Sequence, residues 1–265
     1  MNRLHSYRAL ILFFSILGLS ACSEEEEEPF YFKISTDSCE APLYQNTYIP
    51  IISGNGNYSL EIENNDIIEA QADFSTYTGM PFGVIRILGK QKGETTLSIT
   101  DKVTEITCDL KVKVTDNYLC YTITESNHPA LSKYREVYLI NNDTRDAYFF
   151  DEEKNNVSPL LTRGNYEFVT QNNTPYLILY YAEKDGQITD AANTPPSAHK
   201  FNLRESDSKT FEILKSFLNV DWTTSAQTVR NSGIQLIYLR MQAEDPTQKI
   251  TGYISRDVIP CGLLE

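Results

Sequence analysis

A serine and a histidine, residue types that could do nucleophilic chemistry, stand one residue apart at Ser197 and His199, and a catalytic triad would have to use either His199 or His128. A serine becomes a nucleophile when a neighbouring base removes its proton, and histidine is the most common such base. Many serine hydrolases present the serine on a sharp turn with the pattern Gly-x-Ser-x-Gly, which this chain lacks. We therefore predict no catalytic residues and no enzyme. The alternative is a hydrolase built on two carboxylates within residues 116–265, which would leave no sequence motif.

Sequence motifs typical of metal-binding sites are also absent. The chain contains neither His-Glu-x-x-His nor paired Cys-x-x-Cys. Residues 183–190 resemble a calcium loop in the position of Gly186, but Tyr181 and Ala192 would stand where carboxylate ligands are needed. A hairpin turn at Asp185-Gly186 is the better interpretation. We predict no metal site and no cofactor.

The first 21 residues have the three parts of a secretory signal. Arg3 and Arg8 form a positive start, residues 9–19 form an apolar core, and small residues follow. This core is much shorter than the roughly 20 residues that a membrane-spanning helix needs. Residues 1–21 are therefore expected to be a signal peptide.

Leu19-Ser20-Ala21-Cys22 at the end of this segment resembles the lipobox of bacterial lipoproteins. In that family the cysteine is acylated and becomes the first residue of the mature chain. The resemblance implies that Cys22 carries acyl chains, such as palmitate, that enter the lipid bilayer, and two or more chains suffice for stable anchoring. The alternative is an ordinary secreted protein in which Cys22 lies near the cleavage point by chance.

Five consecutive glutamates, at 24–28, follow the cysteine. Like charges repel, so we expect residues 22–29 to be an extended, lipidated acidic tether. An acidic cluster in this place resembles the surface-export signal of Bacteroidota lipoproteins, which implies an outer-membrane protein exposed at the cell surface. The alternatives are a spacer without a sorting role and a protein on the periplasmic face.

The whole chain is acidic, with 36 Asp and Glu against 23 Lys and Arg and a formal net charge of −13. Loss of residues 1–21 would remove two arginines and no acids, so the mature chain would be more acidic still. An acidic surface repels phosphate backbones, and we predict no nucleic-acid partner.

Four cysteines remain beyond Cys22, and export would place them in an oxidising compartment. We predict two disulfides, Cys39–Cys108 and Cys120–Cys261, each joining the first strand region of a domain to its last. Alternation of apolar and polar residues over 105–114 directs Cys108 toward a core, whereas Cys120 shares its strand face with threonines. Free buried thiols are the alternative.

The first domain is predicted to span residues 30–115 as a β-sandwich. Seven short strand-like runs alternate with turn-rich connectors, without a helical period. The expected strands are 31–35, 47–52, 58–63, 67–72, 82–88, 95–100 and 105–115. The segments 53–59 (SGNGNYS), 64–68 (NNDII) and 89–101 (GKQKGETTLSITD) resemble the bacterial Ig-like domains of the BIG2-like type. That resemblance implies a spacer or adhesive module without catalytic residues.

Residues 116–265 are predicted to form a second β-rich domain, an antiparallel sheet or barrel of no recognised family. The expected strands are 119–124, 136–140, 147–150, 165–170, 176–182, 200–203, 234–241 and 251–255. Phe211, Leu214 and Leu218 recur at helical spacing, which predicts a helix over 206–218. A second short helix at 221–231 would carry Trp222.

Aromatic side chains offer the remaining candidates for ligand binding. The chain has 17 tyrosines and 12 phenylalanines, and most are expected to lie in the core. Tyr148 and Tyr180 lie in aromatic runs that could present rings to a sugar or a peptide, and Trp222 lies in a polar neighbourhood.

The order of these parts predicts a non-catalytic surface lipoprotein. In this interpretation the Ig-like domain is a spacer and the second domain binds a glycan or a protein. The alternatives are a structural or assembly component of a cell-envelope complex and, less favoured, the carboxylate-dependent hydrolase.

Overall fold

The computed structural model describes residues 31–74, 80–132, 135–153, 156–189, 194–218, 220, 236–255 and 257–264. The signal segment, Cys22, the acidic tether, Trp222 and the expected helix at 221–231 lie outside these residues. Within them, no helix has the length and apolar character needed to span a membrane.

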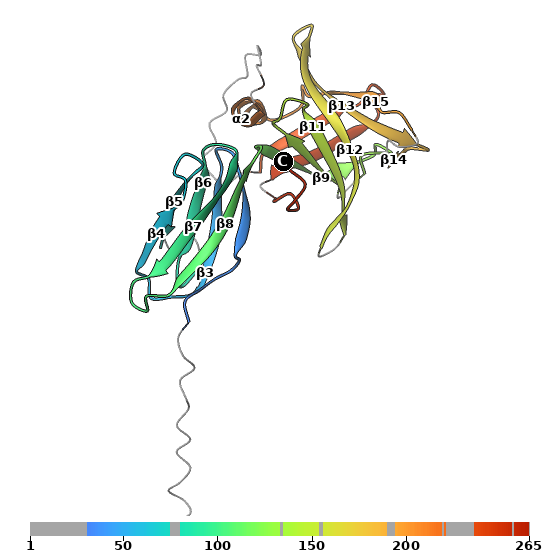
Figure 1. Ribbon diagram of the computed structural model, residues 1–265. Coiled ribbons are helices and arrows are strands. Elements are labelled where there is room, and N and C mark those ends of the chain that lie inside the picture. The colour runs from blue at the N-terminus through green and yellow to red at the C-terminus, as the bar shows by residue number, and fades with distance from the viewer. Residues whose placement is uncertain are drawn as a thin grey trace, which may run out of the picture.

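Two four-stranded sheets form the N-terminal domain (Figure 1). One sheet has the order β1 (Lys33–Ile34), β3 (Asn46–Ser53), β6 (Val84–Gly89) and β5 (Ile68–Asp73). The other has the order β2 (Ser38–Pro42), β8 (Thr107–Thr115), β7 (Gly93–Asp101) and β4 (Tyr58–Ile62). The predicted β-sandwich is confirmed.

Alternation along the strands builds the core of the sandwich. On β7, Leu97 and Ile99 are fully buried, and they are paired with Leu110 and Cys108 of β8. Since side chains of one strand point alternately to opposite faces, the intervening threonines and serines face outward. The sequence reading missed β2, which is short and pairs in parallel with the end of β8.

The C-terminal domain is a closed antiparallel barrel of eight strands. The strand order is β12-β11-β10-β9-β17-β16-β15-β13, and pairing between β12 and β13 closes the ring. The bounds are β9 (Tyr118–Ser126), β10 (Arg135–Ile140), β11 (Asp146–Glu153), β12 (Asn156–Gln171), β13 (Thr174–Lys184), β15 (Ser197–Asn202), β16 (Tyr238–Gln242) and β17 (Lys249–Ser255). The prediction of a sheet or barrel is thus confirmed in its barrel form.

A short strand, β14 (Gln187–Thr189), extends the barrel as a hairpin with β13. The connecting turn is Asp185-Gly186, and both residues have positive φ, at 54° and 76°. Glycine and aspartate tolerate this left-handed region better than bulky residues do. The hairpin expected in place of a calcium loop is therefore present.

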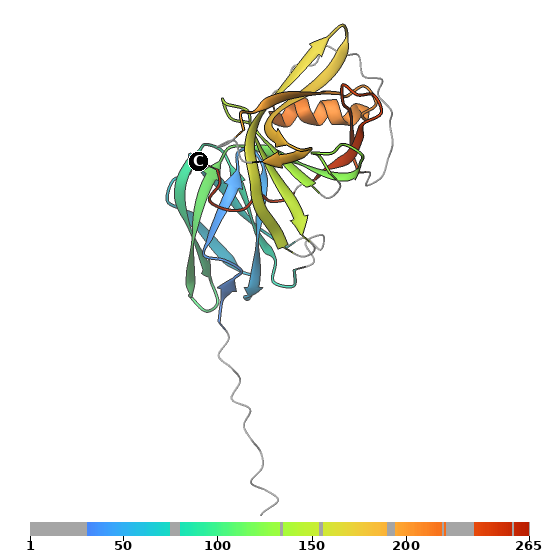
Figure 2. The same ribbon diagram turned by 90° about the vertical axis from the view of Figure 1, so that its right-hand side faces the viewer.

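The inward faces of the strands pack the barrel interior, with odd-numbered side chains on most strands but with Tyr166 on β12 and Ile250 on β17. Leu119, Tyr121 and Ile123 of β9 belong to this core, together with Leu177 and Leu179 of β13. The helix α2 (Ser208–Leu218) packs against the same core through Leu214 and Leu218, as its apolar spacing predicts. Figure 2 shows this helix lying across the strands of the barrel.

The outer face of β9 to β11 forms a second cluster under the C-terminal segment 257–264. Tyr118, Cys120 and Tyr138 pack there with Ile259 and Leu264. The backbone N–H of Ile259 donates a hydrogen bond of 3.2 Å to the hydroxyl of Tyr118. Apolar side chains of the last residues thus cover a part of the barrel wall that would otherwise be exposed.

The same C-terminal segment also contacts the sandwich. Lys113 of β8 donates to the backbone carbonyl of Leu264 at 2.8 Å, and the N–H of Gly262 donates to the Glu40 carboxylate at 2.8 Å. At the connection between the domains, Lys92 forms an ion pair with Asp116 at 2.8 Å. Gln45 of the sandwich also donates to the backbone carbonyl of Tyr118 at 3.0 Å, so several polar contacts join the two domains beside the short step from β8 to β9.

Candidate functional site

One end of the barrel collects polar side chains from several strands. Strand β9 begins beside the sandwich and runs about 30 Å, at roughly 3.3 Å per residue, before the chain reaches His128. Antiparallel pairing brings the end of β13 and the start of β15 to this same end. We call it the distal end, because it lies away from the sandwich.

Ser197, His199 and Glu183 lie in a row at the distal end, with a hydrogen bond between the first two and an ion-pair distance between the last two. The hydroxyl of Ser197 lies 2.9 Å from Nε2 of His199, and Nδ1 of His199 lies 3.7 Å from the nearer carboxylate oxygen of Glu183. Ser197 and His199 share one face of β15 because they are two residues apart, and Glu183 lies on β13, the paired strand. Ser197 is exposed, whereas His199 and Glu183 are partly buried.

The imidazole of His199 is held by a stacked ring. The Tyr181 ring lies parallel to it, with ring centroids 3.8 Å apart and an interplanar angle of 5°. Burial lowers the pKa of His199, while the Glu183 carboxylate and a hydrogen bond to the backbone of Tyr181 oppose this effect. The net pKa lies below its ordinary value of about 6.5, so the imidazole is neutral at neutral pH and can accept a proton.

His128 lies near the same row. Its Nδ1 accepts hydrogen bonds from the backbone N–H groups of Ala130 and Leu131, at 3.2 and 3.1 Å. Burial, together with repulsion from His199, lowers the pKa of His128 to about 4. His128 is therefore a neutral side chain with a fixed tautomer, and both histidines that follow the signal segment meet at one end of the barrel.

The hydroxyl of Tyr181 is a buried polar group without a hydrogen-bond partner among the described residues. Tyr181 is fully buried, and its pKa is raised by burial and by the Glu183 charge, with Arg135 acting in the opposite direction. An unsatisfied buried hydroxyl costs free energy, on the order of 1–3 kcal/mol. Such a group is typical of a site that receives a water molecule or a ligand.

A small hollow of about 160 Å³ opens beside these residues. Its lining includes His128, His199 and Lys200, together with Glu244 and Asp245 from the connection between β16 and β17. The mouth of a β-barrel is a frequent place for ligand binding. The distal end therefore combines a small concavity with polar groups that converge on it.

Sequence reasoning named Ser197 and His199 but missed Glu183 as their partner. Glu183 was considered only within the calcium-like segment. The available signal was alternation: Glu183 shares the inward face of β13 with Leu177, Leu179 and Tyr181. A carboxylate on an inward face at the end of a strand indicates a polar site, but its partner strand was not predictable from spacing.

The aromatic candidates are not part of this row. Tyr148 is only 6% exposed and packs in the cluster under the C-terminal segment, with Arg163 over its ring at 5.6 Å. Tyr180 lies on the outer face of β13 and donates a hydrogen bond of 3.2 Å to Glu167. Tyr180 is thus beside the distal row in the ladder, paired with Ala198, but its side chain faces away from that row, whereas Tyr148 packs under the C-terminal segment. Trp222 lies outside the described residues.

The four described cysteines are free thiols in the structure. Cys39 pairs with Val112 in the parallel ladder of β2 and β8, four positions from Cys108. At about 3.3 Å per residue, this offset of roughly 13 Å exceeds the ~7 Å limit between Cα atoms of a disulfide. The predicted Cys39–Cys108 bridge is therefore wrong. The error came from the missed strand β2, whose register fixes the position of Cys39.

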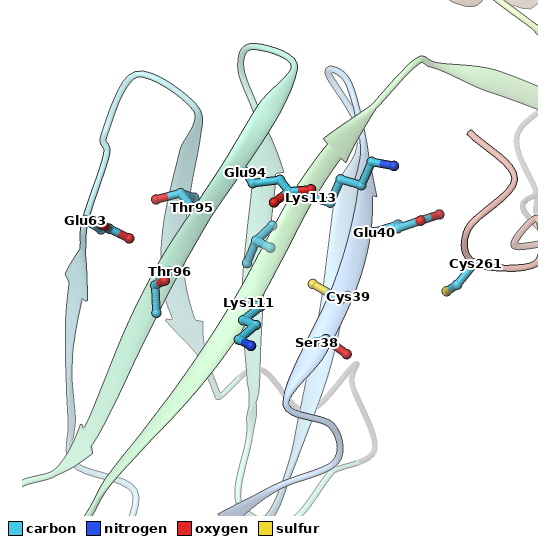
Figure 3. Close-up of a pocket in the computed structure, with 11 residues that line it drawn as sticks. Ser38, Cys39, Glu40, Glu63, Glu94, Thr95, Thr96, Lys111, Lys113 and Cys261 are labelled. Carbon is cyan, nitrogen blue, oxygen red and sulfur yellow. The ribbon is translucent and has the colours of Figure 1, made fainter. Parts of the chain in front are cut away.

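The second predicted bridge, Cys120–Cys261, is not formed either. Cys120 is buried on the outer face of β9, where burial raises the pKa of its thiol to about 12. Cys261 is exposed and lies beside β2, next to the Gly262 amide that binds Glu40. In Figure 3, the Cys261 side chain lies near the strand that carries Cys39 and Glu40.

A larger hollow of about 580 Å³ lies at this junction, on the sandwich side (Figure 3). Lys111 and Lys113 of β8 and Glu94 of β7 line it, together with Glu40 and Cys261. Lys113 and Glu40 are already bonded to the C-terminal segment. Their polar groups therefore join the two domains, and this hollow is a weaker candidate for ligand binding than the distal end.

One set of described residues has the ligand types for a metal ion. Cys120, Glu136 and Asp257 offer ligand atoms that all lie within 4.8 Å of one another. A cysteine binds a metal as the thiolate, whereas burial of Cys120 favours the protonated thiol. The thiol lies 3.9 Å from the hydroxyl of Thr122. We assign no metal to these residues.

No family model and no curated protein matches this sequence. Among solved structures, domains 5–6 of the S-layer protein SbsC share 12% identity with a TM-score of 0.27, over 65% of this chain and 89% of that chain. The structure of rSbsC(31–844) also shares 12% identity with a TM-score of 0.27, over 56% of this chain and 22% of that chain. Both are distant structural similarities to a cell-surface protein, and at this level they do not establish a shared fold or function.

Proposed function

We propose that this chain is an outer-membrane-anchored surface lipoprotein whose barrel binds a ligand at its distal end. In this proposal Cys22 carries the lipid, the glutamate run is the tether, and the sandwich acts as an Ig-like spacer. The observation that carries the proposal is the row of Ser197, His199 and Glu183 beside a small hollow that His199 and His128 line.

The arrangement of the domains supports this layout. The sandwich precedes the barrel in the chain, and the distal end lies on the far side of the barrel from the sandwich. The contacts of Lys113, Glu40 and Lys92 fix the two domains against each other. Because the sandwich lies between the lipid anchor and the barrel, the distal end of the barrel would face away from the membrane. A glycan or a protein could reach it there.

The test is binding of the soluble chain, residues 22–265 with Cys22→Ser, to glycan and protein arrays. We expect one class of array ligand to bind the parent chain, and we expect the Glu183→Ala variant to bind it at least tenfold more weakly. Tyr48→Ser is the matched control, because Tyr48 is an exposed aromatic residue on the sandwich. Binding that persists in Glu183→Ala and is lost in Tyr48→Ser would contradict a site at the distal end.

One observation favours the second candidate, an assembly role in a cell-envelope complex. Tyr48 and Ile52 lie on the outer face of β3, and each is 50% exposed. Apolar side chains gathered on one sheet face are typical of contacts between proteins. A stable oligomer in light scattering that dissociates in a Tyr48→Ser/Ile52→Ser variant would favour this role over ligand binding.

A further inference from the structure

We propose that Ser197 is a nucleophile that accepts an acyl group from small carboxylic esters, with His199 as its general base and Glu183 as a positioning residue. The inference rests on the proposed function in one respect, since it assigns a substrate class to the same distal end. It departs from the non-enzymatic role that the sequence predicts.

The distances between these side chains fit the roles of a nucleophilic serine, its general base and the group that orients the base. A weakly nucleophilic hydroxyl needs a base within about 2.6–3.2 Å, and Nε2 of His199 lies 2.9 Å from the Ser197 hydroxyl. The base in turn needs a third group that orients it, and the Glu183 carboxylate lies 3.7 Å from the opposite ring nitrogen. Tyr181, stacked on the imidazole, fixes the plane of the ring. These are the roles of a Ser-His-acid arrangement, which is recognised by geometry and not by sequence order.

The exposure of each group also fits its role. Ser197 is exposed, so a substrate can reach its hydroxyl. The side chains of His199 and Glu183 are 19% and 25% exposed, and partial burial strengthens the interaction between them. If the Ser197 hydroxyl served only as a hydrogen-bond partner of His199, no carboxylate on the paired strand would be needed.

The proposed reaction transfers an acyl group and protons but no electrons, so it needs no oxidant or reductant. The Ser197 proton moves to Nε2 of His199 as the serine oxygen bonds to the carbonyl carbon of the ester. The carbon–oxygen bond to the alcohol then breaks, and the alcohol leaves with the proton from His199. Water then attacks the carbonyl carbon of the acyl-serine and gives a proton to Nε2 of His199. The bond from that carbon to the serine oxygen breaks, His199 returns the proton to the serine oxygen, and the carboxylic acid leaves.

The surroundings restrict the substrate to a small acyl group on a carrier without negative charge. The adjoining hollow of about 160 Å³ is well below the ~300–1,000 Å³ of sites for drug-sized ligands. Glu244 and Asp245 line this hollow with one cation, Lys200, and Glu183 beside His199 adds a third carboxylate, so negative charge predominates. These negative charges disfavour anionic esters.

The first experiment uses a fluorophosphonate probe and p-nitrophenyl acetate on the soluble chain, residues 22–265 with Cys22→Ser. We expect one phosphonylated site that peptide mass mapping places at Ser197, and loss of this label in Ser197→Ala. Ser59→Ala is the matched control, since Ser59 is also an exposed serine on a strand, and it should label like the parent chain. A parent chain that takes no label, or a Ser197→Ala variant that still takes it, would overturn the proposal.

The roles of His199 and Glu183 are tested by measuring how fast Ser197 is acylated in variants of each. We expect His199→Gln to slow acetylation of the protein by about 100-fold, within the typical range for a general base. Glu183→Gln should slow it about tenfold and move the midpoint of the pH–rate profile to lower pH, which a purely structural role would not do. Rates in both variants equal to that of the parent chain would contradict the assigned roles. Circular dichroism of each variant confirms that it folds.

The outcomes separate this inference from the proposed function. If the array ligand binds through the distal end but Ser197 takes no label, the nucleophile fails and the binding function stands. If Ser197 is labelled but no array ligand depends on Glu183, the binding function fails and the nucleophile stands.

Discussion

The Ser197 hydroxyl and Nε2 of His199, 2.9 Å apart, lie on one strand two residues apart, and their third partner comes from the neighbouring strand. Pairing of Tyr181 with Ser197 sets this arrangement, because it brings the end of β13 beside the start of β15. The site thus depends on strand register in the barrel. A shift by one residue would turn Ser197 and His199 to the other face.

The acylation rate of Ser197 is expected to rise with pH, with a midpoint below the ordinary histidine pKa of about 6.5, and then to become constant. His199 must be neutral to accept the proton, and its pKa lies below the ordinary value. The charged and titratable groups around it are Glu183 of β13, His128 after β9, Lys200 beside it on β15, and Glu244 and Asp245 before β17. Stopped-flow measurement of nitrophenol release between pH 4 and 9 provides the check. A rate that falls as the pH rises from 5 to 7 would exclude His199 as the base.

Gly164 is predicted to be essential for the closure of the barrel. A Cβ atom at this position would lie 2.0 Å from the backbone oxygen of Tyr180 on β13, and a backbone atom cannot move aside as a flexible side chain does. We expect Gly164→Ala to lower the free energy of unfolding by about 3 kcal/mol, the upper part of the range for overpacking. Urea unfolding measures the change. Lys184→Ala, an exposed position on β13, is the control, and an equal effect of both substitutions would contradict the role of Gly164.

The C-terminal segment is predicted to stabilise the barrel through Ile259. This side chain is 2% exposed within the cluster of Tyr118, Cys120 and Tyr138, whereas its neighbour Val258 is 65% exposed. Ile259→Ala should cost about 2–3 kcal/mol, near the lower end for buried isoleucine, and Val258→Ala less than about 0.5 kcal/mol. Thermal unfolding of the two variants tests this directly. Similar melting temperatures would show that the segment does not pack on the barrel in solution.

Lipidation at Cys22 is predicted to hold the protein at the membrane. In cells fed a palmitate analogue with a clickable tag, the parent chain should become labelled and sediment with membranes. Cys22→Ser should lose the label and appear in the soluble fraction, because no other part of the anchor remains. Cys261→Ser is the control, since Cys261 is an exposed cysteine outside the lipobox-like segment. Label retained by Cys22→Ser would contradict the assignment of the lipid site.

Much of the fold was predictable because alternation and turn residues carry local information. The runs of β7 and β8 alternate cleanly, and the helix α2 follows from the spacing of Phe211, Leu214 and Leu218. The strand β2 was missed because Ser38–Pro42 is short, contains a proline and has no alternating pattern. Missing it led directly to the wrong disulfide at Cys39, since its parallel register with β8 depends on distant residues.

The site was predictable only in part, because its members come from separate strands. Ser197 and His199 are neighbours in sequence, so their pairing could be considered from the sequence alone. Glu183 lies on a different strand, and its approach to His199 depends on the pairing of β13 with β15. His128 follows β9 and lies at the same end, where its ring contacts Phe201 of β15. No local sequence pattern predicts that Glu183 or His128 lies close to His199.

The most direct test of the distal site is the titration of His199, followed by ¹⁵N-detected NMR of the imidazole in the parent chain and in Glu183→Gln. We predict a midpoint below about 6.5 in the parent chain and a still lower one in the variant, because the Glu183 carboxylate raises the pKa of His199 against the effect of burial. We also predict that Nε2, which accepts from Ser197, carries no proton in the neutral ring. A midpoint near 6.5 that is identical in the two proteins would contradict the connection between Glu183, His199 and Ser197.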